Sequence, residues 1–190
     1  MAQHLAILDG GLLLYEPEFL PRPAADELFQ RLREQTPWKH EIGRGRPFPR
    51  LTAWYADAGT TYRYSGVAHH GEGWSPDLLL ERQQVEAAAG AAFNSLLLNL
   101  YRDGRDSIGL HTDAEPELGQ NPVVASISLG AVREFVLKHI ATRETLKYPL
   151  AHGSLLVMGG TSQHHWLHGV PKTKTVVGER INLTFRNILR

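Results

Sequence analysis

The second half of this 190-residue chain is divided into short apolar segments separated by turn signals. The segments span 94–101, 107–112, 123–130, 133–139, 145–150, 154–158, 164–168 and 179–187. Pairs such as Asp103-Gly104 and Gly159-Gly160 between them favour turns. Many short strands at this spacing are typical of a sandwich or barrel. We therefore expect a jelly roll, that is, a double-stranded β-helix.

The first half of the chain predicts helices that pack outside this core. Residues 24–35 carry Leu28, Phe29 and Leu32 at helical spacing, and a second helix is expected from Pro76 to about Ala92. Apolar residues at 5–14 indicate a strand with a turn. The fold class expected is mostly β (α+β).

Two further segments of the first half have turn-rich patterns. Residues 51–57 and 61–65 predict a hairpin around Asp57-Ala58-Gly59. Residues 39–50 are rich in Arg, Pro and Gly and predict a mobile loop or an irregular hairpin.

Length and composition limit the classes of protein that fit. A chain of 190 residues suits one domain, 1–190, with an N-terminal part (about 1–93) and a jelly-roll core (about 94–190). Charges balance at 20 basic and 20 acidic residues, so a nucleic-acid partner would need a local patch. There is no cysteine, which excludes disulfides and thiolate metal sites. We expect a monomer with no membrane segment or signal peptide, in the cytoplasm, or in the nucleus if the source is eukaryotic.

A candidate metal site begins with His111 and Asp113. Two residues apart on a strand, they project to the same face. Two His and one carboxylate with open positions opposite are typical of non-haem Fe(II) oxygenases. His168, near the end of a predicted strand, is a candidate for the second His. Each His alone is more often a structural residue.

The last predicted strand separates polar and apolar residues completely. Arg180, Asn182, Thr184 and Arg186 share one face, and the other face is apolar. This alternation fits a strand with its polar face in water. It also suits a dicarboxylate ligand, because guanidinium binds carboxylate with paired hydrogen bonds. Asn99 and Tyr101 could add donors from a neighbouring strand.

The order and spacing of these residues resemble the AlkB family of Fe(II)/2-oxoglutarate dioxygenases, most closely its eukaryotic DNA-repair-type branch. His168 follows Asp113 by 55 residues, and the two arginines follow His168 by 12 and 18. The resemblance runs from about Phe48 to Arg190. Its most specific stretches are NLYRDG (99–104), IGLHTDAE (108–115), ASISLGA (125–131), LAHGSLL (150–156) and RINLTFR (180–186).

The resemblance implies roles for these residues and implies Fe(II), 2-oxoglutarate and O2 as cofactor and co-substrates. Fe(II) would be bound by His111, Asp113 and His168. 2-Oxoglutarate would be held by Asn99, Tyr101, Arg180, Thr184 and Arg186. The wall of a modified-base pocket would be formed by Tyr62, Tyr64, Ser65 and Glu115.

The hairpin at 42–50 matches the one that probes the duplex in the family. Ile42 stands at the position of the wedge aromatic, with Phe48 as the alternative, and we expect Arg44, Arg46 and Arg50 to face phosphates. From the residues alone, a solvated connection is an equally good interpretation of this segment.

The implied function is oxidative demethylation of N-alkylated bases, of the 1-methyladenine and 3-methylcytosine type. The substrate would be single- or double-stranded alkylated DNA, or RNA, and the products formaldehyde, succinate and CO2. Three alternatives stay open: a dioxygenase acting on a protein, RNA or a small molecule; a zinc hydrolase that uses the same three ligands; and a non-catalytic jelly-roll binding module.

Overall fold

The computed structural model describes residues 2–43, 45–64 and 67–189, and for Tyr64 it describes the backbone only. Arg44 and Ser65, both expected at the substrate side, lie outside the described residues. None of the described helices has the length and apolar character needed to cross a membrane.

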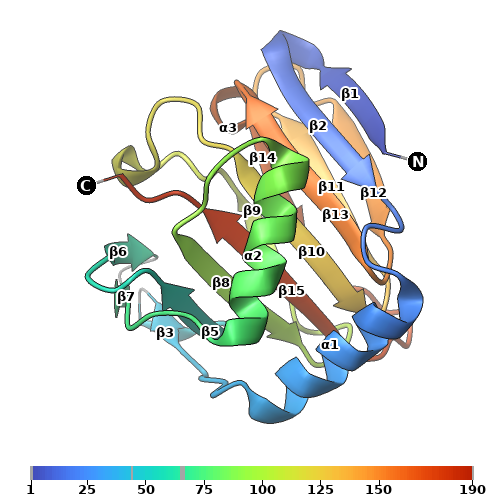
Figure 1. The fold of residues 1–190 in the computed structure, drawn as a ribbon. Helices are drawn as coiled ribbons and strands as arrows, with labels where there is room; N and C mark the ends of the chain where they lie inside the picture. The colour runs from blue at the N-terminus through green and yellow to red at the C-terminus, as the bar shows by residue number, and fades with distance from the viewer. Residues whose placement is uncertain (1, 44, 65–66, 190) are drawn as a thin grey trace.

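Two antiparallel sheets face each other and form the jelly roll (Figure 1). Within the described residues the larger sheet has seven strands, in the spatial order β1 (Gln3–Ile7), β2 (Gly11–Glu16), β13 (Ser154–Gly160), β10 (Val124–Gly130), β15 (Arg180–Arg186), β8 (Ser95–Tyr101) and β5 (Leu51–Ala56). The smaller sheet has the order β12 (Thr145–Leu150), β11 (Arg133–His139), β14 (Trp166–Val170) and β9 (Ile108–His111). The expected mostly β class and jelly-roll core are confirmed.

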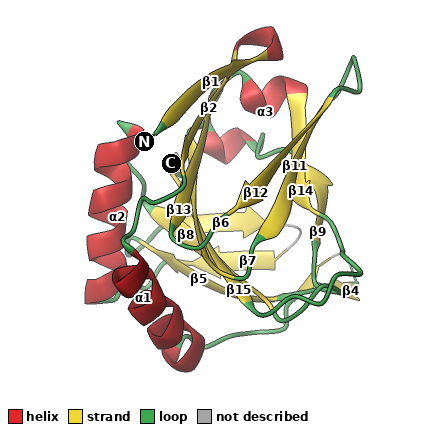
Figure 2. Ribbon diagram, turned by 90° about the vertical axis from the view of Figure 1, so that its right-hand side faces the viewer, coloured by secondary structure: helices red, strands yellow, loops and turns green. Residues whose placement is uncertain are grey.

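The two long helices cover the outer face of the larger sheet (Figure 2). Helix α1 (Arg22–Gln35) buries Ala25, Leu28 and Leu32. Helix α2 (Pro76–Ala89) begins where the Ser75 hydroxyl accepts the Leu78 N–H, and ends at Gly90 with φ +61°. The shorter helical segments are η1 (Leu8–Gly10), η2 (Pro116–Leu118) and α3 (Ser162–His165).

Strand β15 explains how the sequence positions the site. Its apolar residues Ile181, Leu183 and Phe185 are fully buried in the core beneath the helices. The polar residues of the opposite face are also buried, each exposed by 9% or less, because that face looks into the space between the two sheets. The interpretation that this polar face lies in water is therefore wrong.

The expected hairpin of 51–57 with 61–65 does not form. Strand β5 instead pairs with β8 and completes the edge of the larger sheet. Strand β6 (Thr61–Tyr64) pairs with β7 (Val67–His70). Residues Ile42–Gly43 (β3) and Arg46–Pro47 (β4) pair as a short hairpin, as expected.

The segment expected as a strand at 164–168 is divided. Its first residues, His164 and His165, belong to α3, and β14 begins at Trp166. The turn of helix is anchored by the Ser162 hydroxyl, which donates to the Gly159 carbonyl at 2.6 Å. His168 still lies on a strand, as the expected site requires.

Candidate active site

The structure brings His111, Asp113 and His168 together between the sheets. His168 on β14 and His111 on β9 are direct cross-strand neighbours, with ring centroids 4.4 Å apart. The Nε2 atoms of His111 and His168 lie 3.8 Å and 3.6 Å from the Asp113 carboxylate oxygens Oδ1 and Oδ2. Three potential ligand atoms thus converge on one point, in a group that matches a two-His, one-carboxylate metal site.

The hydrogen bonds around this group favour metal binding. His111 Nδ1 lies 2.9 Å from the Gly109 carbonyl, so the ring carries its proton there and Nε2 keeps a free lone pair. The Asp113 backbone N–H donates to Gln163 Oε1 at 2.8 Å, which fixes the residue just after β9. Gln163 was not identified from the sequence, because its partner Asp113 is 50 residues away along the chain.

The charge state of the site also suits a cation. Burial alone would raise the pKa of Asp113, but Arg186 and the two histidines outweigh it and hold this pKa far below its usual range. Burial and the neighbouring His168 lower the pKa of His111 to about 4. At neutral pH the site therefore offers an ionised carboxylate and a neutral His111 imidazole, the forms that bind metals.

Two buried arginines stand beside the metal-ligand group. Arg186 Nη2 contacts both Asp113 oxygens at 3.0 Å. Arg180 is fully buried with its guanidinium 5.1 Å from the Tyr101 ring, and its Nη2 donates to Ser128 Oγ at 2.8 Å. Its Nε and Nη1 are buried and have no hydrogen-bond partner among the described residues. Burial lowers the Arg180 pKa, yet a guanidinium stays charged in proteins, so this site fits an anionic ligand.

Every residue expected to bind the metal or 2-oxoglutarate lines one cavity between the sheets. These residues are Asn99, Tyr101, His111, Asp113, His168, Arg180, Thr184 and Arg186. The remaining wall is largely apolar, with Leu97, Val124, Phe135 and Met158 among its residues. A cavity that combines three potential metal ligands with two buried guanidinium groups and a largely apolar wall is thus present in the fold.

The expected substrate-side residues fall into two groups. Tyr62 is buried and packs in a cluster with Phe48, Leu97, Leu118 and Ile188. Glu115 is half-buried, and its Oε2 is buried without a hydrogen-bond partner among the described residues. At the hairpin, Ile42 is 65% exposed and Arg46 is exposed, while Phe48 is buried and does not suit a wedge.

Arg50 departs from what the sequence suggested. Its side chain is only 3% exposed, and its Nε donates to Asn99 Oδ1 at 2.6 Å. An arginine so placed does not face phosphates, because its guanidinium points into the protein beside the co-substrate residues. The alternation of the sequence gave no indication of this, since the contact joins a loop to a strand 49 residues later.

A second group with metal-ligand atoms consists of Asp9, His139 and His165. The Thr142 N–H donates to His139 Nδ1 at 3.1 Å, so the neutral ring carries its proton on Nε2 and donates it to Asp9 Oδ2 at 3.0 Å. A metal at Nε2 would displace this proton and break the contact with Thr142. We interpret the group as a structural hydrogen bond that fastens the β1–β2 turn to β11, a partner for His139 that the sequence did not suggest.

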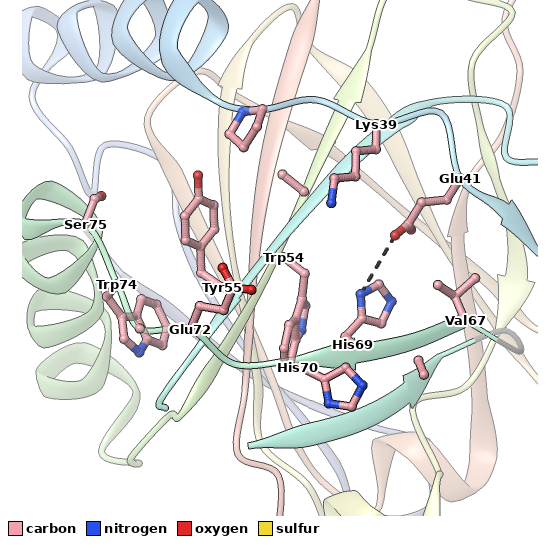
Figure 3. Close-up of a pocket in the computed structure, with 14 residues that line it drawn as sticks. Lys39, Glu41, Trp54, Tyr55, Val67, His69, His70, Glu72, Trp74 and Ser75 are labelled. Carbon is pink, nitrogen blue, oxygen red and sulfur yellow. Dashed lines mark ion pairs between the residues drawn. The ribbon is translucent and has the colours of Figure 1, made fainter. Parts of the chain in front are cut away.

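A larger pocket, of about 670 Å³, lies beside β5 at the edge of the larger sheet (Figure 3). Figure 3 shows Glu41 directed towards His69, whose Nδ1 is 3.8 Å from the Glu41 carboxylate, with Trp54 next to the ring. Burial lowers the pKa of His69, so this ring is neutral at pH 7. None of the expected metal or 2-oxoglutarate residues lines this pocket, and we assign the chemistry to the smaller cavity.

Comparison with known proteins gives a consistent result. The family model of the 2OG-Fe(II) oxygenase superfamily matches residues 12–186. The chain is 40% identical over 186 residues to the alpha-ketoglutarate-dependent dioxygenase alkB homolog 3 of Bos taurus, covering 90% of this chain and 64% of that protein. It is 40% identical over 180 residues to the DNA oxidative demethylase ALKBH2 of Homo sapiens, covering 87% and 69%.

A solved structure titled "The structure of OsALKBH1" shares the fold, with a TM-score of 0.72 and 19% identity. The match covers 97% of this chain and 100% of that one. The chain thus spans about two thirds of the length of the curated relatives and the whole of this solved structure.

Proposed function

The chain belongs to the 2OG-Fe(II) oxygenase superfamily and, within it, to the AlkB family, and on that premise we propose that it is an oxidative demethylase of N-alkylated bases in nucleic acid. One observation carries the proposal most directly. A buried group of two His and one Asp shares a cavity with the buried guanidinium of Arg180, whose Nε and Nη1 have no hydrogen-bond partner among the described residues.

We assign Fe(II) to His111, Asp113 and His168, whose donor atoms match its preferred ligands. We assign 2-oxoglutarate to Arg180 and Arg186, with Asn99, Tyr101 and Thr184 around it. When bound, the iron and its co-substrate supply the oxidation of the N-methyl carbon by O2, with succinate, CO2 and formaldehyde as products. The protein contributes binding, orientation and electrostatics.

The arginines have separate tasks in this proposal. Arg180 compensates a carboxylate deep in the cavity, where burial strengthens the attraction between opposite charges. Arg186 keeps Asp113 ionised and in place, and it lies where a second carboxylate would also meet it. The apolar wall that includes Val124, Phe135 and Met158 limits the access of water to the reacting group.

The substrate side combines an aromatic wall with an acid. A base that is to react must leave the duplex stack or be single-stranded already. We propose that Tyr62, Tyr64 and Ser65 surround this base and that Glu115 accepts a hydrogen bond from its exocyclic amine. Burial raises the Glu115 pKa, and its unpartnered Oε2 supports a role as an acceptor.

The hairpin of β3 and β4 is the proposed contact with the rest of the nucleic acid. Ile42 is exposed at its start and is able to wedge between bases. Arg46 is exposed and free to approach phosphates. Methylated adenine and cytosine of the 1-methyladenine and 3-methylcytosine type are cationic, which suits an acidic, aromatic pocket.

The proposal is tested by turnover of oligonucleotides that carry 1-methyladenine or 3-methylcytosine, as single- and double-stranded DNA and as RNA. Mass spectrometry should show loss of one methyl group that depends on both Fe(II) and 2-oxoglutarate. Methylated peptides serve as the comparison. Turnover without 2-oxoglutarate, or with peptides alone, would contradict the assignment.

A further inference from the structure

Arg50 is a buried arginine whose side chain ends beside Asn99, a residue of the proposed co-substrate cavity, rather than at the surface. It directly precedes β5, and its Nε donates to Asn99 Oδ1 at 2.6 Å on the neighbouring strand β8. The guanidinium also lies 4.9 Å from the Phe48 ring centroid and 3.5 Å from the Ser107 carbonyl. Asn99, with 3% of its surface exposed, lines the cavity together with Arg180 and Thr184.

The donor-only chemistry of arginine fixes which way the Asn99 amide faces. A guanidinium has no acceptor, so it can bond only to the amide oxygen Oδ1. The Asn99 amide nitrogen Nδ2 must then point away from Arg50, and it donates to Asn182 Oδ1 at 3.4 Å. Reversing the amide would set two donors against each other at Arg50 and two oxygens against each other at Asn182.

The next amide is fixed in the same sense by its own partners. Asn182 Nδ2 donates to Ser126 Oγ at 2.5 Å and to the Ile127 carbonyl at 3.1 Å. Because the Ile127 carbonyl can only accept, Nδ2 cannot exchange places with Oδ1, which accepts the Thr184 hydroxyl at 2.7 Å. The whole polar chain thus has one direction, from Arg50 through Asn99 to the residues of β15.

We propose that Arg50 is a positioning residue for the co-substrate: it holds Asn99 so that an N–H donor, and not an oxygen, faces the cavity. The inference rests on the proposed function. A carboxylate or keto oxygen that enters the cavity meets a donor only in this orientation. Arg50 itself needs no contact with the co-substrate or with nucleic acid.

Binding of 2-oxoglutarate to the Mn(II)-loaded protein without O2, measured by titration calorimetry, tests the inference. Arg50→Met keeps most of the side-chain volume and removes the donors. We expect it to weaken 2-oxoglutarate binding roughly 10-fold, the value of one buried hydrogen bond. Affinity for Mn(II) should not change. Arg22→Met, the same substitution at an exposed arginine of α1, is the matched control and should bind 2-oxoglutarate as the wild type does.

A double-mutant cycle separates positioning from a general structural effect. If Arg50 acts through Asn99, Arg50→Met should cause no further loss in an Asn99→Ala background. Wild-type affinity in Arg50→Met, or a full additional loss in the double variant, would overturn the inference.

Two further outcomes keep the inference apart from the proposed function. If Arg50→Met does not fold, Asn99→Asp is used in its place. This variant keeps an oxygen for Arg50 but presents an oxygen to the cavity, so 2-oxoglutarate binding should weaken. Unchanged binding of 2-oxoglutarate would overturn the inference. Failure of the wild type to bind 2-oxoglutarate would instead overturn the proposed function.

Discussion

Arg180 and Arg186 are both buried, yet they are compensated differently. Arg186 contacts the Asp113 carboxylate, whereas Arg180 has no carboxylate beside it among the described residues. A buried charge without a counter-ion destabilises a fold, and replacing it by an apolar side chain is often neutral or stabilising. Arg180 is therefore better explained by an anion that binds to it than by stability.

This explanation predicts the behaviour of Arg180→Met. The melting temperature of the protein without co-substrate should stay the same or rise, because an uncompensated charge has been removed. The increase in melting temperature that 2-oxoglutarate gives the Mn(II)-loaded wild type should be lost, since binding to the folded state is its cause. A thermal-shift titration with 2-oxoglutarate measures both effects; an undiminished increase would contradict the role of Arg180.

Gln163 gives a second prediction for a single residue. Its Oε1 accepts the Asp113 N–H inside the protein, so Gln163→Leu should leave this donor unpaired and Asp113 less well oriented. Mutation of a residue that supports a metal ligand typically weakens metal binding by about 10–100-fold, and we expect Gln163→Leu to weaken Mn(II) binding within that range. Titration calorimetry measures it. Gln30→Leu, at an exposed position of α1, is the control and should bind Mn(II) normally.

Among the elements, the β3–β4 hairpin has the most exposed apolar side chain near the proposed substrate side, Ile42. If Ile42 wedges between bases, Ile42→Ala should reduce turnover of double-stranded DNA several-fold more than turnover of single-stranded DNA. Parallel kinetics on the two substrates measure the ratio. Leu80→Ala, which removes a similarly exposed side chain from α2, should leave the ratio unchanged. An equal effect on both substrates would argue against a wedge.

The connection between β8 and β9 is held by Asp106, which accepts Arg102 Nε at 2.7 Å and the Arg102 backbone N–H at 2.9 Å. Burial opposes ionisation, but these bonds outweigh it and lower the pKa of Asp106. A lowered folded-state pKa stabilises the fold above the unfolded-state value, and this stabilisation is lost as the pH falls through the folded-state pKa.

Asp106→Asn should therefore be less stable than the wild type at pH 7, by about 1 kcal/mol because Arg102 is half-exposed. The difference should begin to shrink as the pH falls below about 4, the unfolded-state value, and should disappear once the pH is below the lowered folded-state pKa and Asp106 is protonated. Urea unfolding at several pH values measures it, with Glu18→Gln at an exposed carboxylate as the control. A difference that persists in acid would contradict the assignment to Asp106 ionisation.

Elements with a clear hydrophobic periodicity could be predicted from the sequence. Elements whose pairing depends on residues far away in the chain could not. Strands β10, β11, β12 and β15 lie within one residue of the expected ranges, because alternation and turn residues are local signals. The partner of β5 is instead β8, about forty residues later, and the local sequence around Asp57 gives no indication of this pairing. The sequence likewise identified the residues of the cavity on β15 but not Gln163 or the direction of Arg50.

For the whole molecule, stability and site depend on the same strand. Leu183 is fully buried in the core under the helices, while its neighbours Asn182 and Thr184 line the cavity on the other face. Leu183→Ala should lower the free energy of unfolding by about 2–5 kcal/mol through the cavity it leaves. Urea unfolding measures this, and Leu12→Ala, at a side chain that is 53% exposed, should change it little. A small effect of Leu183→Ala would mean that the core can collapse around the lost volume.

The position of β15 has a consequence for synthesis of the protein on the ribosome. Among the described residues this strand is the last in sequence order, yet it lies between β10 and β8 in the larger sheet. When only the first 179 residues have left the ribosome, the strands of the larger sheet form two separate groups with no strand between them. Arg180 and Arg186 are then both missing. The larger sheet and the cavity are therefore both completed in one step, when residues 180–186 leave the ribosome and pair between β10 and β8.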